Sequence, residues 1–207
     1  MPVKGDKFPR RKPKDYATVR DDIRSGDILL CAGTNTVSKM IQGATESCWS
    51  HVAFILRLDG IQRIMVLESL MSVGVRTVPL SHYIRNFKGK NEGYSGKLLI
   101  ARHSQFETVV NQDKLRAMSQ FAVDRFGYPY DHDEMTRILS RIVASKLGMK
   151  PKKKTPDDRE YICSEYAYEC YKSIGIKIPV NKHGFISPAD FAACEEINAV
   201  SAIKVES

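Results

Sequence analysis

The sequence predicts an α+β protein, in which a small, mainly antiparallel sheet packs against helices. Two apolar runs that flank Asp59 and Gly60 have the pattern of a β-hairpin. Apolar residues recur at helical spacing in residues 107–126, 135–147 and 161–174, which predicts three helices. With 207 residues, of which 43% are apolar, the chain is long enough for one globular domain with a substantial core.

The other elements follow from local signals along the chain. Before the hairpin, we expect a short helix or turn over residues 16–24, a strand over 28–31 and a helix over 35–43, capped by Thr34 or Asn35. After the hairpin, the sequence predicts a strand over residues 75–78, a turn or short helix over 79–84, a strand over 97–103, the three helices, a capped short helix over 187–191 and a closing strand over 199–205.

The helix near the C-terminus carries Cys163 in its first turn. Cys163, Ala167, Cys170 and Ile174 recur at helical spacing and predict one buried face, and Gly175 can end the helix in the left-handed conformation. A thiol at a helix N-terminus is exposed to the positive end of the helix dipole, which favours the nucleophilic thiolate. The alternative is that Cys163 is an inert buried residue, as free cysteines usually are.

A histidine and a glutamate lie at the far ends of the predicted hairpin. If Asp59 and Gly60 form a two-residue turn, His51 lies directly opposite Glu68, and opposed side chains on one face are roughly 4.5–5.5 Å apart at Cβ. A carboxylate at that distance can hold an imidazole in one tautomer, as in a nucleophile–base–carboxylate triad. A solvated ion pair and a hydrogen-bonded core histidine are the alternatives. A register slip of one residue would separate the two side chains onto opposite faces.

Five short motifs together resemble a known family. In chain order they are residues 26–30 (GDILL), 49–52 (WSHV), 67–69 (LES), 127–131 (GYPYD) and 161–165 (YICSE). This set resembles the circularly permuted branch of the NlpC/P60 papain-like superfamily, which includes the YiiX-like proteins. It is similar to the poxvirus G6 group and, more distantly, to lecithin:retinol acyltransferase-like proteins. The resemblance covers residues 26–191 and implies a permuted papain-like fold, in which the histidine strand precedes the cysteine helix.

The resemblance also implies a mechanism and a set of site residues. Cys163 would be the nucleophile, His51 the base and Glu68 the third residue of a catalytic triad, acting through a thioester acyl-enzyme. Asp27 competes for the third role, but the hairpin pattern reaches only Glu68. By resemblance, a tyrosine near the cysteine can help to hold the oxyanion, and Tyr128, Tyr130 and Tyr161 are the candidates to line the cleft. The triad implies acyl transfer and leaves the substrate open.

Three functions therefore remain in competition. The first is a cysteine peptidase or amidase that cleaves peptide or peptidoglycan-like amides, which the YiiX-like resemblance favours. The second is a lipid-directed thiol hydrolase or acyltransferase, which a basic N-terminus favours. The third is a non-catalytic binding module that keeps the fold.

Charge and cysteine content restrict the partners. The net charge is +8, of which residues 1–14 carry +5 and residues 150–154 carry +4. We expect residues 1–15 to form a flexible basic arm and residues 16–207 to form the single domain. The basic residues either contact an anionic surface such as a membrane or are simply solvated. No pattern for specific nucleic-acid binding is present. Neither a secretory signal nor a run of about 20 apolar residues is present, so we expect a cytoplasmic protein, one delivered by another route, or a mature form.

The five cysteines predict neither a disulfide framework nor a metal site. An odd number of cysteines without a secretory signal argues against structural disulfides. No run of cysteine and histidine has the spacing of a zinc site, so we expect no metal and no other cofactor. His82, His103, His132 and His183 are expected to be ordinary surface or core histidines.

Overall fold

A six-stranded antiparallel sheet forms the centre of the protein in a computed structural model. The model describes residue 8 and residues 11–132, 136, 161–181 and 185–206. The strands are β1 (Ile28–Gly33), β2 (His51–Leu58), β3 (Arg63–Leu70), β4 (Gly74–Pro79), β5 (Gly96–His103) and β6 (Ile197–Ile203). They lie in the order β4-β3-β2-β1-β5-β6, and every neighbouring pair is antiparallel. The predicted mainly antiparallel sheet is confirmed.

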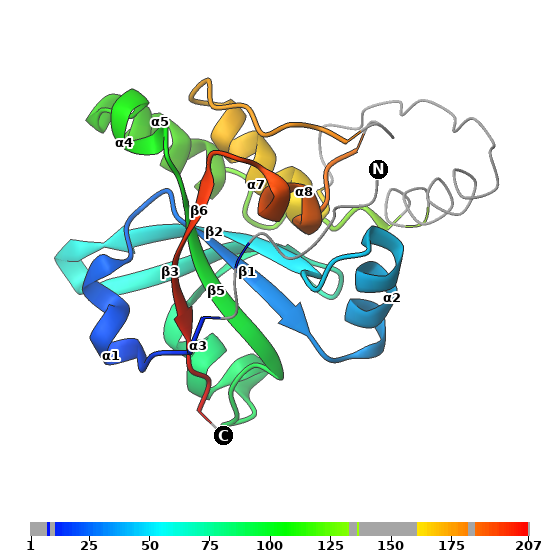
Figure 1. The fold of residues 1–207 in the computed structure, drawn as a ribbon. Helices are drawn as coiled ribbons and strands as arrows, with labels where there is room; N and C mark the ends of the chain where they lie inside the picture. Colours follow the sequence, from blue (N-terminus) through cyan, green and yellow to red (C-terminus); the bar gives the residue numbers. More distant parts are fainter. Residues whose placement is uncertain (1–7, 9–10, 133–135, 137–160, 182–184, 207) are drawn as a thin grey trace.

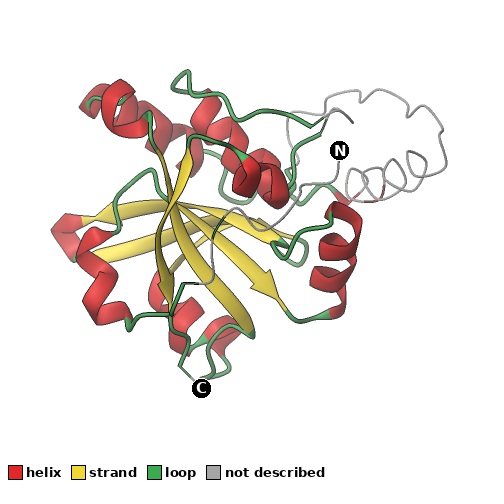
Figure 2. Cartoon of the chain, in the orientation of Figure 1, coloured by secondary structure: helices red, strands yellow, loops and turns green. Residues whose placement is uncertain are grey.

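Helices cover both faces of this sheet (Figures 1 and 2). On one face lie α4 (Phe106–Val109), α5 (Gln112–Val123), α7 (Cys163–Lys172) and α8 (Pro188–Ala193). On the other lie α1 (Tyr16–Val19), which runs into a 3-10 turn, and α3 (Leu80–Arg85), while α2 (Thr36–Thr45) follows β1 at one end of the sheet. Because both faces are covered, all six residues of β1 are buried. The two larger hydrophobic clusters among the described residues lie on opposite faces of the sheet.

Helix α7 contributes its predicted face to the larger cluster. Ala167 and Cys170 are completely buried, and Cys163 and Ile174 are each 5% exposed. Two tyrosine hydroxyls anchor the helix to the rest of the domain: Tyr166 donates to the Ala122 carbonyl at 2.7 Å, and Tyr171 donates to the Gly26 carbonyl. Helix α7 is therefore attached both to α5 and to the segment just before β1. These two attachments fix the position of its first turn.

The hairpin forms with a different register from the one that the sequence predicted. Residues 59–62 make the turn, with a 3-10 helix over Asp59–Ile61 and Gln62 in the left-handed region at φ 50°. A type I′ turn at Asp59–Gly60 would need positive φ at both residues, and neither has it. Phe54 consequently pairs with Leu67, so the register is shifted by two residues from the predicted pairing of Val52 with Leu67. A shift of two preserves the face of every side chain, whereas a shift of one would have reversed it.

A second correction concerns the helix predicted over residues 107–126. It is divided into α4 and α5, because Val110 is extended (φ −99°, ψ 112°) between them. Asn111 then caps α5 by accepting a hydrogen bond from the Lys114 N–H at 2.9 Å, the role in which asparagine favours a helix start. Of the two caps that the sequence allowed for α2, Thr34 and Asn35, the structure has Asn35. The capped helix start predicted at Ser187–Pro188 is confirmed.

Parts of the predicted arm that the structure describes contact the domain. The ring of Phe8 packs edge-on against Trp49, with centroids 6.3 Å apart, and Lys14 pairs with the end of β6. The rest of the arm, the helix predicted over residues 135–147 and the basic segment 150–154 lie wholly or mostly outside the described residues. No helix in the described ranges combines the length and apolarity needed to cross a membrane.

Candidate active site

Cys163 is the first residue of α7, as the sequence predicted. The preceding residue, Ile162, is extended (φ −79°, ψ 163°), and its N–H donates to the Glu165 carboxylate at 3.4 Å. The neighbouring Ser164 hydroxyl donates to the Ile186 carbonyl at 2.8 Å, which ties this turn to the segment before α8. Cys163 thus lies at the helix N-terminus, where unpaired N–H groups and the helix dipole favour negative charge.

His51 is the first residue of β2 and meets Glu68 of β3. The Nε2 atom of His51 lies 2.8 Å from Oε2 of Glu68. The observed register, carried one residue further, places Glu68 opposite Ala53 and therefore diagonal to His51 on the same face. Diagonal neighbours are roughly 7–8 Å apart, which a glutamate and an imidazole can span. The two side chains meet as the sequence predicted, although the pairing that brings them together differs.

Two further side chains, which the sequence did not indicate, hold Glu68. Arg76 lies directly opposite Glu68 in the β3–β4 pair and donates to Oε1 from Nε at 3.0 Å and from Nη2 at 2.9 Å. The hydroxyl of Tyr83, on α3, donates to Oε2, the same oxygen that contacts His51. Glu68 has no exposed surface, and these charge-assisted and hydroxyl donors compensate for its burial. Arg76 could have been predicted as a partner of Glu68 from the sequence, by pairing the strand at residues 74–79 with the preceding strand. Tyr83 could not, because it reaches Glu68 only through the packing of α3 on the sheet.

The electrostatics of the site favour charged forms of the histidine and the glutamate. Burial by itself lowers the pKa of His51, but the adjacent Cys163, its hydrogen bond to the ring and the Glu68 carboxylate outweigh burial and raise the pKa to about 10. Burial raises the pKa of Glu68, but the hydrogen bond and charge of His51 outweigh it, so the pKa is lowered overall. Because Nε2 of His51 contacts Glu68, Nδ1 is the ring nitrogen available to the Cys163 thiol.

Cys163 and His51 line one cleft, which has a volume of about 470 Å³. Side chains from α2, the β3–β4 turn and α3 form its walls, and most of them are apolar or carry small hydroxyls. Tyr130 lines this cleft, as expected for one of the three tyrosines. Tyr128 and Tyr161 instead stack on each other, with centroids 6.3 Å apart.

Asp27, the competing candidate for the third role, belongs to a different network. It is buried and accepts hydrogen bonds from Arg102 at 2.6 and 2.9 Å and from the Arg24 N–H at 2.8 Å. Burial raises the pKa of Asp27, and the arginine opposes this shift. The preference for Glu68 over Asp27 as the partner of His51 agrees with this geometry.

The remaining histidines are distributed over other parts of the molecule. His82 borders a separate hollow beside Arg76 and Lys88, and His132 packs on the ring of Tyr130. His103 is buried beside Cys194 and Glu196. His183 lies outside the described residues.

Comparison with known proteins identifies the family. A search of curated proteins found no significant match. A solved structure described as metalloprotein yiiX from Escherichia coli O157:H7 has a similar fold, with a TM-score of 0.61 and 18% sequence identity over 87% of this chain and 98% of that chain. The family model for the permuted papain-like amidase enzymes, YaeF/YiiX, C92 family, matches residues 22–191. The family match supports a permuted papain-like fold and a cysteine-type hydrolase. The chain therefore belongs to this family of permuted papain-like amidases.

Proposed function

We propose that this protein is a cysteine amidase in which Cys163 is the nucleophile, His51 the general base and acid, and Glu68 the residue that orients His51. The observation that carries the proposal is that His51 contacts Glu68 at 2.8 Å and lines one cleft together with Cys163, whose proximity raises the pKa of His51. A nucleophile, a base and an orienting group in this order define the papain-like arrangement.

The proposed reaction begins from a thiolate–imidazolium pair. The Cys163 sulfur attacks the carbonyl carbon of the substrate, and the backbone N–H of Cys163, at the first helical position, is a donor for the oxyanion. His51 then gives its Nδ1 proton to the leaving amine, so the C–N bond breaks and a thioester remains on Cys163. His51 next removes a proton from water, which attacks the thioester. The C–S bond breaks, the acid is released, and the thiolate–imidazolium pair is restored. Glu68 remains ionised and holds the ring through Nε2.

The cleft supports a substrate with an apolar acyl portion, such as a peptide or muropeptide amide with apolar side chains. Val37 of α2 and Met71 of the β3–β4 turn line the cleft while remaining 42% and 39% exposed. Apolar side chains that line a site and stay accessible bind apolar ligand groups by removing them from water.

These same exposed apolar residues favour a second candidate, a lipid-directed hydrolase or acyltransferase. In that case the basic residues in 1–14 would bring the cleft to an anionic membrane. Liposome binding of the full chain and of a chain that begins at residue 15 separates the two candidates. An amidase that acts on soluble substrates binds anionic vesicles no better than neutral ones, whereas the lipid-directed enzyme loses its preference for anionic vesicles without the arm.

Trapping of the acyl-enzyme tests the proposal directly. The protein is exposed to a pool of peptides, muropeptides and phospholipids, quenched in acid, and analysed by mass spectrometry of the peptide that contains Cys163. We expect a thioester adduct on Cys163 whose mass identifies the acyl group. His51→Ala is expected to abolish the adduct. A pool that produces product without any adduct on Cys163, or an adduct that persists unchanged in His51→Ala, would contradict the proposal.

A further inference from the structure

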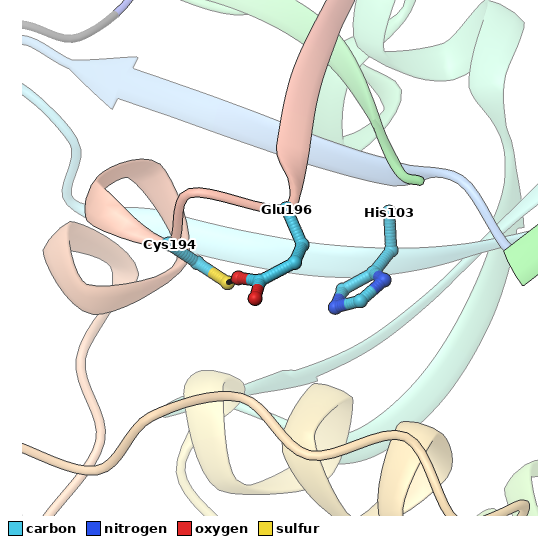
Figure 3. Close-up of side chains that lie close together, drawn as sticks. All are labelled: His103, Cys194 and Glu196. Atoms are coloured by element: carbon cyan, nitrogen blue, oxygen red, sulfur yellow. Dashed lines mark hydrogen bonds between the residues drawn. The ribbon is translucent and has the colours of Figure 1, made fainter. Parts of the chain in front are cut away.

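A second group of histidine, cysteine and glutamate lies outside the cleft. His103 is the last residue of β5, Cys194 follows α8, and Glu196 immediately precedes β6 (Figure 3). One potential ligand atom from each of the three lies within 4.8 Å of the other two, and within the described ranges no other group of three such side chains meets this distance. None of the three lines the cleft that contains Cys163.

The histidine of this group has a buried nitrogen that lacks a partner. His103 is 1% exposed, and its Nε2 makes no hydrogen bond with any described part of the chain. Figure 3 shows the ring edge turned toward the Glu196 carboxylate and the Cys194 sulfur. A buried polar atom without a partner is unfavourable, so its presence calls for an explanation such as a bound ion.

The three donor types are those that zinc prefers. Zinc binds cysteine sulfur at about 2.3 Å, histidine nitrogen at about 2.0–2.1 Å and carboxylate oxygen at about 2.0–2.2 Å, with tetrahedral geometry. The Cys194 sulfur already lies 3.1 Å from Oε2 of Glu196. Since ligands around zinc are separated by roughly 3.3–3.7 Å, the imidazole needs only a small approach to complete three positions, which leaves the fourth for water.

Ion binding must also rearrange two protons. The Cys194 thiol donates to Glu196, and this proton would leave to solvent when the thiolate binds the cation. Nδ1 of His103 accepts a hydrogen bond from the Gln105 N–H at 3.2 Å, so the neutral ring carries its proton on Nε2. Coordination through Nε2 requires this proton to move to Nδ1 and the Gln105 N–H to turn away. Gln105 is exposed, so water can replace the lost bond.

The His103 ring is held in place by an aromatic neighbour. The ring of Tyr171 packs against it, with centroids 5.8 Å apart.

We propose that His103, Cys194 and Glu196 form a zinc site that ties the end of β5 to the start of β6. The Ser104 N–H already donates to the Glu196 carbonyl at 2.8 Å, so the two segments are adjacent before any ion binds. A cation that binds the folded chain and has no preformed site in the unfolded chain stabilises the fold by mass action. The site is separate from the proposed triad and does not depend on it.

The test uses tag-free protein that carries Cys163→Ala, so that the cleft cysteine cannot contribute a ligand. Zinc binding is measured by competition with a chromophoric chelator, and Co²⁺ is added as a spectroscopic probe. We expect one zinc per chain, a sulfur-to-cobalt charge-transfer band in the near ultraviolet, and an increase in Tm with zinc. A sample that binds no zinc against the chelator, or one whose Co²⁺ complex lacks the sulfur band, would overturn the proposal.

Substitutions assign the ligands. Cys194→Ser and His103→Gln are each expected to weaken zinc binding by at least about 100-fold, more than the loss typical of residues that only support a ligand. Cys48→Ser, which changes an exposed cysteine elsewhere, is the matched control and should leave zinc affinity unchanged. Circular dichroism checks the fold of each variant. If the buried substitutions unfold the chain, Glu196→Gln replaces them, because this side chain is only partly buried. Undiminished affinity in the folded variants would overturn the assignment.

Discussion

The chain contains two groups that each consist of a cysteine, a histidine and a glutamate. The groups differ in which of the other two side chains the carboxylate contacts. In the first group, the Glu68 carboxylate contacts the imidazole of His51, and Arg76 and Tyr83 fix that carboxylate. In the second, the Glu196 carboxylate accepts from the thiol of Cys194, and Nε2 of the histidine has no partner in the described chain. A carboxylate that is hydrogen-bonded to the imidazole orients a base. When the carboxylate is instead hydrogen-bonded to the thiol, the imidazole nitrogen is left available, and all three side chains can bind one cation. Residue type alone therefore does not decide between a triad and a metal site.

Cys163→Ala tests the first half of this comparison with the largest expected effect. We expect amide hydrolysis and labelling by a thiol-directed probe at this site to fall by about 10⁴-fold or more, because loss of the nucleophile removes the covalent route. Labelling is measured by mass spectrometry at neutral pH. Cys48→Ser is the control, since Cys48 is exposed and outside the cleft. If Cys163 in the wild-type chain labels no faster than Cys48, the triad assignment fails.

Glu68→Gln tests whether the carboxylate on the imidazole matters. We expect kcat to fall by about 10³-fold, because the amide does not stabilise the imidazolium. The pH profile provides a second measurement. The raised pKa of His51 keeps the ring protonated up to a pH of about 10, so activity that needs the imidazolium falls above that pH. Since Glu68 contributes to this rise, the alkaline limb should move to lower pH in Glu68→Gln; an unmoved limb would argue against an ion pair between these residues.

Tyr83→Phe probes the support of Glu68 with a smaller effect. Removing one hydrogen bond to a charged, buried group costs about 1.5–3 kcal/mol, which corresponds to a loss of roughly 10-fold or more in rate if the bond acts through His51. We expect the loss in kcat with KM nearly unchanged, because Glu68 stays ionised but holds the His51 ring less firmly. A change confined to thermal stability, with kcat intact, would assign Tyr83 a purely structural role.

The smallest expected effect concerns stability at low pH. The pKa of Glu68 is lowered in the folded protein, so its contribution to stability is fully present above the unfolded value near 4.5 and is lost as the pH falls through the folded value. One proton taken up on unfolding gives a slope of at most about 1.4 kcal/mol per pH unit. Urea titrations between pH 3 and pH 6 should show a shallower pH dependence for Glu68→Gln than for the wild-type chain, and identical slopes would contradict this linkage.

Much of the fold could be predicted because its signals are local. The caps at Asn35 and Ser187, the start of α7 at Cys163 and the alternating strands each depend on neighbouring residues. The hairpin register could not, because a four-residue turn and a two-residue turn both fit the letters Asp-Gly, and the choice depends on backbone angles. The break at Val110 was missed for a similar reason: apolar spacing continues across it, while the Asn111 cap divides the helix.

By itself, the sequence determined the types of residue that can do chemistry and which local elements carry them: a cysteine at a helix start, and a histidine and a glutamate on one face of a hairpin. Only the tertiary structure decided which distant side chains join them. Tyr83 reaches Glu68 from α3, and His103 at the end of β5 meets Cys194 in the segment after α8. The physical reason is that a hydrogen bond acts over about 3 Å, so its partner is set by packing between segments distant in sequence, which no local pattern encodes.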